Sequence, residues 1–189
     1  MERKYRSYGI PGLKIYKNYL TEEQEQNLIE HINSEPQIWN NDLERRTQQY
    51  GYKYDYGARR LTDAPTIPAF LIDQICRLID DGLMISVPDQ CIINEYTPGQ
   101  GISPHIDHPL LFDDEIASIS LGSPCIMEFN IDGDAEERIY LRRRSLLVMK
   151  GEARSKYKHS IPARTYDCID GVRYKRETRI SITFRTIKK

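Results

Sequence analysis

From Asp89 to its C-terminus the chain carries short segments in which apolar and polar residues alternate, separated by turns that contain Gly and Asp. This pattern predicts a run of β-strands. Upstream, Thr21 and Gln24 form the signature of a capping box that opens one helix, and apolar residues at helical spacing predict a second from about Pro68 to Asp81. Helices followed by strands predict an α+β fold whose sheet rolls into a jelly-roll barrel. The stronger strand candidates are residues 91–96, 117–121, 125–131, 145–149 and 178–187.

The length and the charge of the chain limit the class of protein. Its 189 residues are enough for one domain, which we expect to span 1–189. The net charge of −1 argues against a polycation that binds nucleic acid by bulk charge. No apolar run approaches the roughly 20 residues needed to cross a bilayer. We therefore expect an intracellular monomer, cytoplasmic or nuclear, with no membrane association.

Two histidines and one aspartate form a candidate metal site. His105 and Asp107 are two residues apart, so in an extended segment both point to the same side, and His159 is a candidate third ligand. Two His and one carboxylate bind non-haem Fe(II) and leave positions open for O2 and a co-substrate. A catalytic zinc could use the same three residues, so a zinc hydrolase is an alternative.

The segment from Arg179 to Arg185 is a strand with one polar and one apolar face. Arg179 and Arg185 lie on the polar face, which either meets water or lines the barrel cavity. Inside a cavity, two guanidiniums need a partner with two negative charges, and 2-oxoglutarate provides them. Asn94 and Tyr96 share a face of another strand and can bond the same acid. A zinc hydrolase has no use for this arginine pair, so the pattern favours an Fe(II)- and 2-oxoglutarate-dependent dioxygenase.

The order of these residues resembles the AlkB family of Fe(II)/2-oxoglutarate dioxygenases. Within that family the chain is most similar to the catalytic module that hydroxylates a modified wobble uridine in tRNA. The resemblance implies a double-stranded β-helix in which His105, Asp107 and His159 hold iron. It also implies that 2-oxoglutarate is bound by Asn94, Tyr96, Arg179 and Arg185. The segments that carry the resemblance are Asn94 to Asp107, Ser118 to Ser123, Arg143 to Met149, His159, and Arg179 to Arg185.

Two departures from the family pattern narrow the expected substrate. Family members that repair nucleic acid often carry an acidic residue two positions after the metal-binding aspartate, where this chain has Pro109. The tRNA-modifying relatives also have a zinc-binding Cys cluster after the last arginine strand, whereas this sequence ends four residues after Arg185. The Cys cluster limits the resemblance to the tRNA-modifying relatives, and because of Pro109 repair of alkylated bases is not expected to be the main task.

Residues 45–60 fall where the family places its nucleotide-recognition lid. Tyrosines interleaved with arginines suit base stacking and phosphate contact, which predicts RNA or single-stranded DNA as the substrate. Alternatives are a solvated hairpin in place of a lid, a dioxygenase that hydroxylates or demethylates a protein side chain, and a catalytically silent nucleic-acid-binding module. The predicted substrate-binding residues are Arg45, Arg46, Tyr50, Tyr52 and Tyr54.

Overall fold

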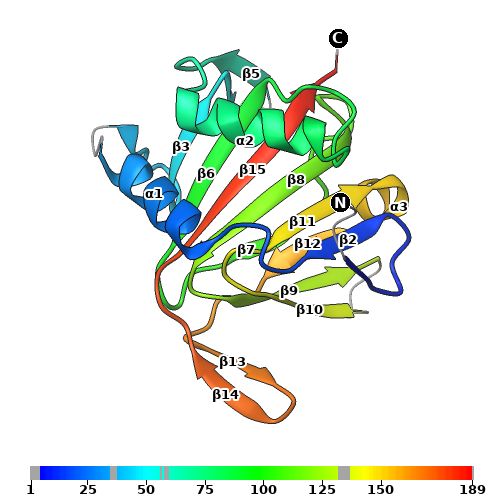
Figure 1. The fold of residues 1–189 in the computed structure, drawn as a ribbon. Helices are drawn as coiled ribbons and strands as arrows, with labels where there is room; N and C mark the ends of the chain where they lie inside the picture. The colour runs from blue at the N-terminus through cyan, green and yellow to red at the C-terminus, as the bar shows by residue number, and fades with distance from the viewer. Residues whose placement is uncertain (1–4, 35–37, 56, 58–59, 132–136, 189) are drawn as a thin grey trace.

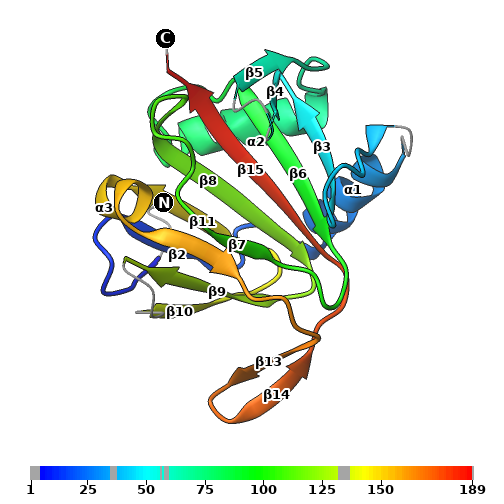
Figure 2. The same ribbon diagram turned by 180° about the vertical axis from the view of Figure 1, so that it is seen from behind.

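Two antiparallel sheets face each other and form the centre of the molecule (Figures 1 and 2). The computed structural model describes residues 5–34, 38–55, 57, 60–131 and 137–188. The large sheet contains, in spatial order, β1 (Arg6–Ser7), β2 (Leu13–Tyr16), β11 (Leu146–Lys150), β8 (Phe112–Gly122), β15 (Arg179–Ile187), β6 (Gln90–Tyr96) and β3 (Arg46–Tyr50). The small sheet contains β10 (Glu137–Leu141), β9 (Cys125–Asn130), β12 (Lys158–Ile161) and β7 (Ile102–His105). This arrangement confirms the predicted jelly-roll core.

Two helices cover the outer face of the large sheet. The helix α1 (Glu22–Asn33) begins at the predicted capping box, in which Thr21 and Gln24 bond each other reciprocally. The helix α2 (Ala69–Asp80) ends before Gly82, whose positive φ of 66° suits a helix C-terminus. Both predicted helices are confirmed. No helix in the described ranges has the length and hydropathy to span a bilayer.

The alternation along β15 divides the protein into two cores. The apolar residues Ile180, Ile182 and Phe184 pack against the buried faces of α1 and α2. Arg179 and Arg185 are on the opposite face, which is turned toward the small sheet. A second apolar cluster fills the space between the sheets and joins residues of β2, β9, β10 and β11. The site described below lies in this inner layer, away from the helices.

Two hairpins flank the barrel. The strand β4 (Tyr52–Asp55) pairs with β5 (Arg60–Asp63) beside β3 and β6, where the lid was predicted. Within the predicted lid, Tyr50 belongs to β3, and Tyr56 lies outside the described residues. The second hairpin, formed by β13 (Tyr166–Ile169) and β14 (Val172–Lys175), projects from the other end of the molecule (Figure 1). A five-residue helix, α3 (Gly151–Ser155), follows β11.

Candidate active site

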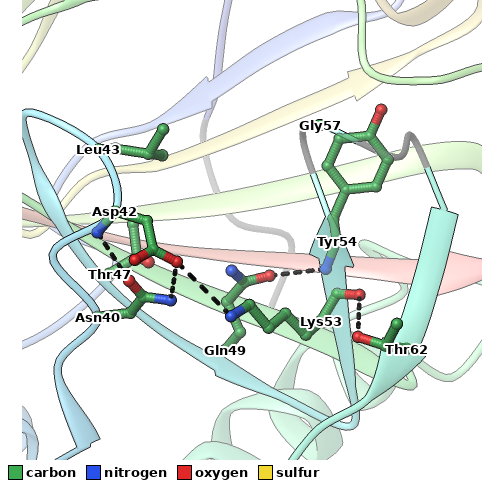
Figure 3. Close-up of a pocket in the computed structure, with 9 residues that line it drawn as sticks. All are labelled: Asn40, Asp42, Leu43, Thr47, Gln49, Lys53, Tyr54, Gly57 and Thr62. Carbon is green, nitrogen blue, oxygen red and sulfur yellow. Dashed lines mark hydrogen bonds and ion pairs between the residues drawn. The ribbon is translucent and has the colours of Figure 1, made fainter.

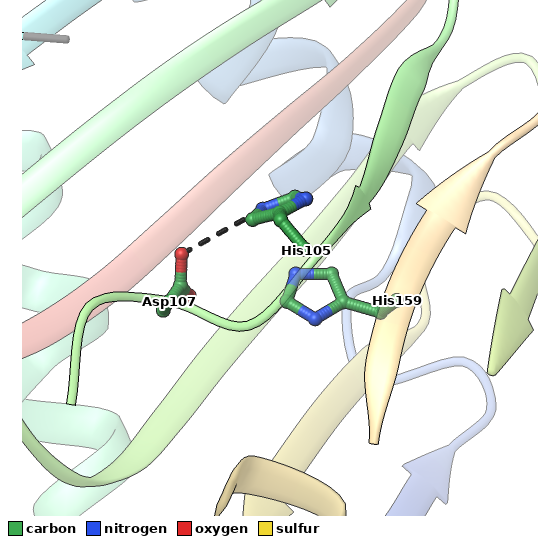
Figure 4. Close-up of side chains that lie close together, drawn as sticks. All are labelled: His105, Asp107 and His159. Carbon is green, nitrogen blue, oxygen red and sulfur yellow. Dashed lines mark ion pairs between the residues drawn. The ribbon is translucent and has the colours of Figure 1, made fainter. Parts of the chain in front are cut away.

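The three predicted metal ligands lie together at the end of β7 and on the neighbouring strand β12 (Figure 4). His105 and His159 are paired directly in the register of β7 and β12, and Asp107 follows in the loop after β7. Their nearest ligand atoms all lie within 4.8 Å of one another, and His105 Nε2 is 3.7 Å from Asp107 Oδ1. The residues thus form the compact set of two imidazoles and one carboxylate that non-haem iron requires.

A backbone contact sets the tautomer of His105. Its Nδ1 donates a hydrogen bond of 2.8 Å to the carbonyl oxygen of Ser103. Because a carbonyl can only accept, Nδ1 carries the proton and Nε2 of the neutral ring presents its lone pair toward Asp107. The histidine is therefore oriented for metal binding before any metal arrives.

Charge and burial keep the other two ligands in their metal-binding forms. Burial alone would raise the pKa of the Asp107 carboxyl, but Arg185 and the two histidines outweigh it and lower this pKa to about 2. Burial lowers the pKa of His159 to about 3, and the neighbouring His105 acts in the same direction. At neutral pH the aspartate is thus ionised and the imidazole is neutral, as ligation requires.

A buried arginine that the sequence did not single out holds the loop after β7. Arg154 of α3 is 4% exposed and donates three hydrogen bonds to backbone carbonyls, those of Asp107 (2.8 Å), Phe112 (3.3 Å) and Asp113 (3.3 Å). These contacts fix both ends of the loop that carries the metal-binding carboxylate. One arginine in a charged segment gives no signal of burial, so sequence reasoning missed it.

The two arginines of β15 face the barrel interior, so the solvent-facing alternative is excluded. Arg179 is 3% exposed and donates one hydrogen bond, from Nη2 to Ser120 Oγ (2.9 Å). Its Nε and Nη1 have no hydrogen-bond partner within the described parts of the chain, and neither does Nε of Arg185. Buried donors without acceptors are costly, and they fit the carboxylates of a bound dianion. Arg185 also donates to Asp107 Oδ1 (3.0 Å), and this bond connects the arginine pair of β15 to the metal ligands.

Asn94 and Tyr96 lie beside the arginines on the same face of the sheet. The register pairs Tyr96 with Arg179 and Asn94 with Ser181, and the Arg179 guanidinium carbon is 5.5 Å from the centre of the Tyr96 ring. One small cavity is lined by both residues together with the metal set and Arg185. Asn94, Tyr96 and Arg185 thus share one cavity with the metal ligands, whereas Arg179 is not among its lining residues and lies beside it next to Tyr96.

A larger pocket of about 500 Å³ opens onto the metal set. Two of the predicted substrate-binding residues line it, Arg45 and Tyr54. The Nε of Arg45 donates to Asn94 Oδ1 (2.9 Å), which holds the guanidinium at the pocket wall. The remaining wall is largely apolar, with polar groups near the ligands, as in typical small-molecule sites. Its apolar members are Leu43, Ile92, Ile102, Ile106, Pro109 and Phe112.

The other three predicted substrate-binding residues lie outside this pocket. Arg46 makes a two-pronged ion pair with Glu95 (2.6 and 2.9 Å) and covers the ring of Trp39, so its guanidinium is already engaged. Tyr50 is buried in the helix-side core and its hydroxyl donates to Gln48 Oε1. Tyr52 is 38% exposed on β4 and does not line the pocket, although strand alternation places it on the same side of β4 as Tyr54. We therefore retain only Arg45 and Tyr54 as candidate substrate contacts.

A second cavity of about 330 Å³ adjoins this pocket, and Figure 3 shows the residues that line it. Leu43 and Tyr54 line both cavities. Its floor is polar, and the amide of Gln49 accepts a hydrogen bond from the Tyr54 backbone N–H (2.8 Å). This bond joins β3 to β4 and so fixes the residue that separates the two cavities.

Comparison with known proteins places the chain in a family. Residues 12–185 match the model of the 2OG-Fe(II) oxygenase superfamily. An uncharacterized protein, L905 of Acanthamoeba polyphaga mimivirus, is 40% identical over all of this chain and 92% of its own length. The tRNA (carboxymethyluridine(34)-5-O)-methyltransferase alkbh8 of Xenopus tropicalis is 34% identical over 94% of this chain, which spans only 32% of that protein. The Alkylated DNA repair protein ALKBH8 homolog of Arabidopsis thaliana is 34% identical over 95% of this chain and 59% of its own length.

A solved structure supports the same assignment at the level of the fold. The structure of OsALKBH1 superimposes with a TM-score of 0.75 over 97% of this chain and all of that chain, at 16% sequence identity. The matching barrel, the ligand set and the buried arginine pair fit iron and a dicarboxylic keto-acid. The chain belongs to the 2OG-Fe(II) oxygenase superfamily, among its AlkB-like members, and is a dioxygenase that uses Fe(II), 2-oxoglutarate and O2.

Proposed function

We propose that the protein oxidises a modified or alkylated base in nucleic acid, by hydroxylation or oxidative demethylation. The observation that carries the proposal is the pocket of about 500 Å³ that opens directly onto the metal set and has Arg45 and Tyr54 in its wall. An aromatic ring and a cation beside an apolar cavity suit a base and its phosphate. The names of the Xenopus and Arabidopsis relatives refer to tRNA and to alkylated DNA, which supports nucleic acid as the substrate class.

In this proposal the chain's own residues divide into three groups. His105, Asp107 and His159 hold the iron, and Asn94, Tyr96, Arg179 and Arg185 hold 2-oxoglutarate. When bound, the iron and the keto-acid supply the oxidising power for attack on a carbon–hydrogen bond. The apolar pocket wall excludes water, and Arg45 and Tyr54 orient the base so that the reacting carbon faces the metal set.

Within nucleic acids, we propose that the substrate is a base in RNA, and tRNA is the first substrate to test. The pocket has Pro109 two residues after the metal-binding aspartate, so its wall is apolar at that point. An apolar wall there favours a neutral modified base over the cationic bases that many alkylations produce. Such an enzyme would act where tRNA is found, in the cytoplasm or the nucleus.

The proposal is tested by mass spectrometry of nucleosides. Total tRNA, mRNA and DNA are incubated separately with the Fe(II)-loaded protein and 2-oxoglutarate, then digested and compared with untreated samples. We expect one modified nucleoside to decrease in a single pool, with an equal amount of succinate released. His105→Ala should abolish both changes, whereas His31→Ala, on α1 and remote from the metal set, should preserve them. Iron-dependent succinate release with no nucleoside change in any pool, but with oxidation of added peptides, would refute nucleic acid as the substrate.

A further inference from the structure

The β13–β14 hairpin projects from the barrel and takes part in neither of its two sheets (Figures 1 and 2). All four residues of β14 are exposed. Large side chains on the hairpin meet solvent, with Tyr166 41%, Val172 52% and Tyr174 43% exposed. A lone two-stranded hairpin is at best marginally stable in water, so one that holds aromatic side chains outward needs an anchor.

A buried aspartate supplies that anchor. Asp167 of β13 accepts two hydrogen bonds from Arg176 (2.7 and 2.8 Å), one from Arg164 (2.8 Å) and one from the backbone N–H of Ile126 (3.1 Å). Ile126 belongs to β9, so the base of the hairpin is fixed to the small sheet. The hairpin is therefore held in place, and its outward face does not depend on local packing.

Tyrosines and cations lie on both faces of the hairpin, because the register and strand alternation place Tyr166, Arg173 and Lys175 on one face and Tyr174 on the other. The Arg173 guanidinium carbon lies 4.4 Å from the centre of the Tyr166 ring. The rings of Tyr174 and Tyr140 are 6.1 Å apart, which extends the surface onto β10, where Arg142 covers the Tyr140 ring at 5.6 Å. Lys175 is paired with Tyr166 in the register. We call this surface the hairpin patch, defined by Tyr140, Arg142, Tyr166, Arg173, Tyr174 and Lys175.

We propose that the hairpin patch binds single-stranded nucleic acid outside the reacting nucleotide, an inference that rests on the proposed function. Bases stack on tyrosine faces in any sequence, and the three cations match the phosphates between them. The buried Asp167 at the base of the hairpin is neutralised by Arg176 and Arg164, and Asp170 in the turn is the other acidic residue of the hairpin. Both features suit a sequence-tolerant contact that adds affinity while the pocket selects the base.

A surface depression leads from the active-site pocket toward the base of the hairpin. It has a volume of about 350 Å³, shares Ile102 and Ser103 with the pocket, and continues along residues 160–163. Two acidic residues line it, Glu44 and Glu128, and Glu128 is paired with Arg138 (3.3 Å). The metal ligand His159 and Tyr166 are seven residues apart, so their Cα atoms are separated by at most about 25 Å. One strand a few nucleotides long can therefore occupy both places.

The experiment compares long and short substrates in the full-length protein. In the double variant Tyr166→Ala/Arg173→Ala, which removes the tyrosine–cation pair of one hairpin face, the Kd for a fluorescent single strand of about 20 nucleotides should rise at least fivefold, as expected for the loss of one stacked base. The slope of log K against log salt concentration should fall by about 0.7 for the removed cation. The matched control Tyr5→Ala/Lys14→Ala removes another tyrosine–cation pair (4.6 Å), between the exposed Tyr5 just before β1 and the partly exposed Lys14 of β2, and should change neither quantity.

Turnover separates this proposal from the proposed function. The hairpin variant should oxidise a substrate trinucleotide at the wild-type rate and unfold at the wild-type temperature. If the hairpin variant binds long strands as tightly as the wild type, the hairpin patch does not bind nucleic acid, even if base oxidation is observed. If no base is oxidised but the variant still binds long strands more weakly, the patch stands and the proposed function fails. RNA and DNA strands of one sequence, tested in parallel, identify which nucleic acid the patch prefers.

Discussion

At the scale of single residues, Arg179 illustrates a conflict between stability and ligand binding. Its guanidinium is buried, and two of its nitrogens have no partner among the described residues, so the charge destabilises the protein when no acid is bound. We predict that Arg179→Met raises the free energy of unfolding without 2-oxoglutarate by roughly 1–4 kcal/mol, the range seen when buried ionic groups are replaced by apolar ones.

The same substitution should remove the response to the acid. With Mn(II) in place of iron, 2-oxoglutarate at 100 times its Kd should stabilise the wild type by about 2.7 kcal/mol and leave Arg179→Met unchanged. Thermal unfolding with and without the acid measures both effects. Exposed Arg138→Met serves as the control and should behave like the wild type. A variant that still gains stability from the acid would show that Arg179 does not bind it.

Arg154 allows a second prediction at this scale, on how the metal ligand is positioned. Replacement by Met removes the side-chain donor from three backbone carbonyls, at roughly 1–3 kcal/mol for each one that is left buried and unpaired. Because one of them belongs to Asp107 itself, we expect Arg154→Met to weaken Mn(II) binding at least tenfold, a typical result for residues that support ligands. Isothermal titration with Mn(II) measures this loss, and Arg154→Lys should restore part of it. Metal affinity equal to that of the wild type would assign Arg154 a purely structural role.

At the scale of elements, the base of the β13–β14 hairpin makes stability depend on pH. Burial tends to raise the pKa of Asp167, but the bonds from Arg176 and Arg164 outweigh it, and the pKa falls below its ordinary value of 3.8. A lowered carboxyl pKa contributes stability that is complete above the unfolded-state pKa and is lost as the pH falls through the folded-state value. The anchor should therefore hold at neutral pH and fail in acid.

Asp167→Asn tests this dependence. At pH 7 the variant should lose about 3–5 kcal/mol, because it leaves the buried Arg176 without its partner. The difference from the wild type should shrink as the pH falls below about 4, where the wild-type carboxyl itself becomes protonated. Urea unfolding at several pH values gives this difference directly. A difference that stays constant from pH 7 to pH 3 would contradict the assigned role of the carboxylate.

The elements also show which features the sequence could predict. The capping box at Thr21 and the alternation along Arg179 to Arg185 depend on local physics, and the structure confirms both. The strand β8 begins at Phe112, upstream of the predicted Ala117, because Glu115 in its acidic start pairs with Lys150 of the neighbouring strand. Strands β13 and β14 were missed because their exposed residues show no buried alternation. They pair with each other across the turn Asp170–Gly171, and this Asp-Gly dipeptide was the local signal that could have found them.

At the scale of the whole molecule, the site depends on pairings between distant segments. The sequence indicated His105, Asp107 and His159 as ligands, but the direct register of β7 with β12 that brings the imidazoles together appears only in the fold. In the predicted lid, by contrast, residues that are adjacent in the sequence are separated by the fold. Arg45 and Arg46 are equivalent in the sequence, yet strand alternation sends one to the pocket and the other to Glu95.

The large sheet separates the core that stabilises the fold from the core that supports the site, and two phenylalanines can test this division. Phe184 and Phe129 are both fully buried, but Phe184 packs beneath the helices whereas the Phe129 ring lies 6.2 Å from the ring of His159. Each Phe→Ala change should cost about 3–5 kcal/mol of unfolding free energy. Only Phe129→Ala should also weaken Mn(II) binding, because the cavity it leaves releases the imidazole from its packed orientation. Unfolding in urea and titration with Mn(II) measure the two effects. An equal loss of metal affinity in both variants would show that the two cores are coupled through the sheet.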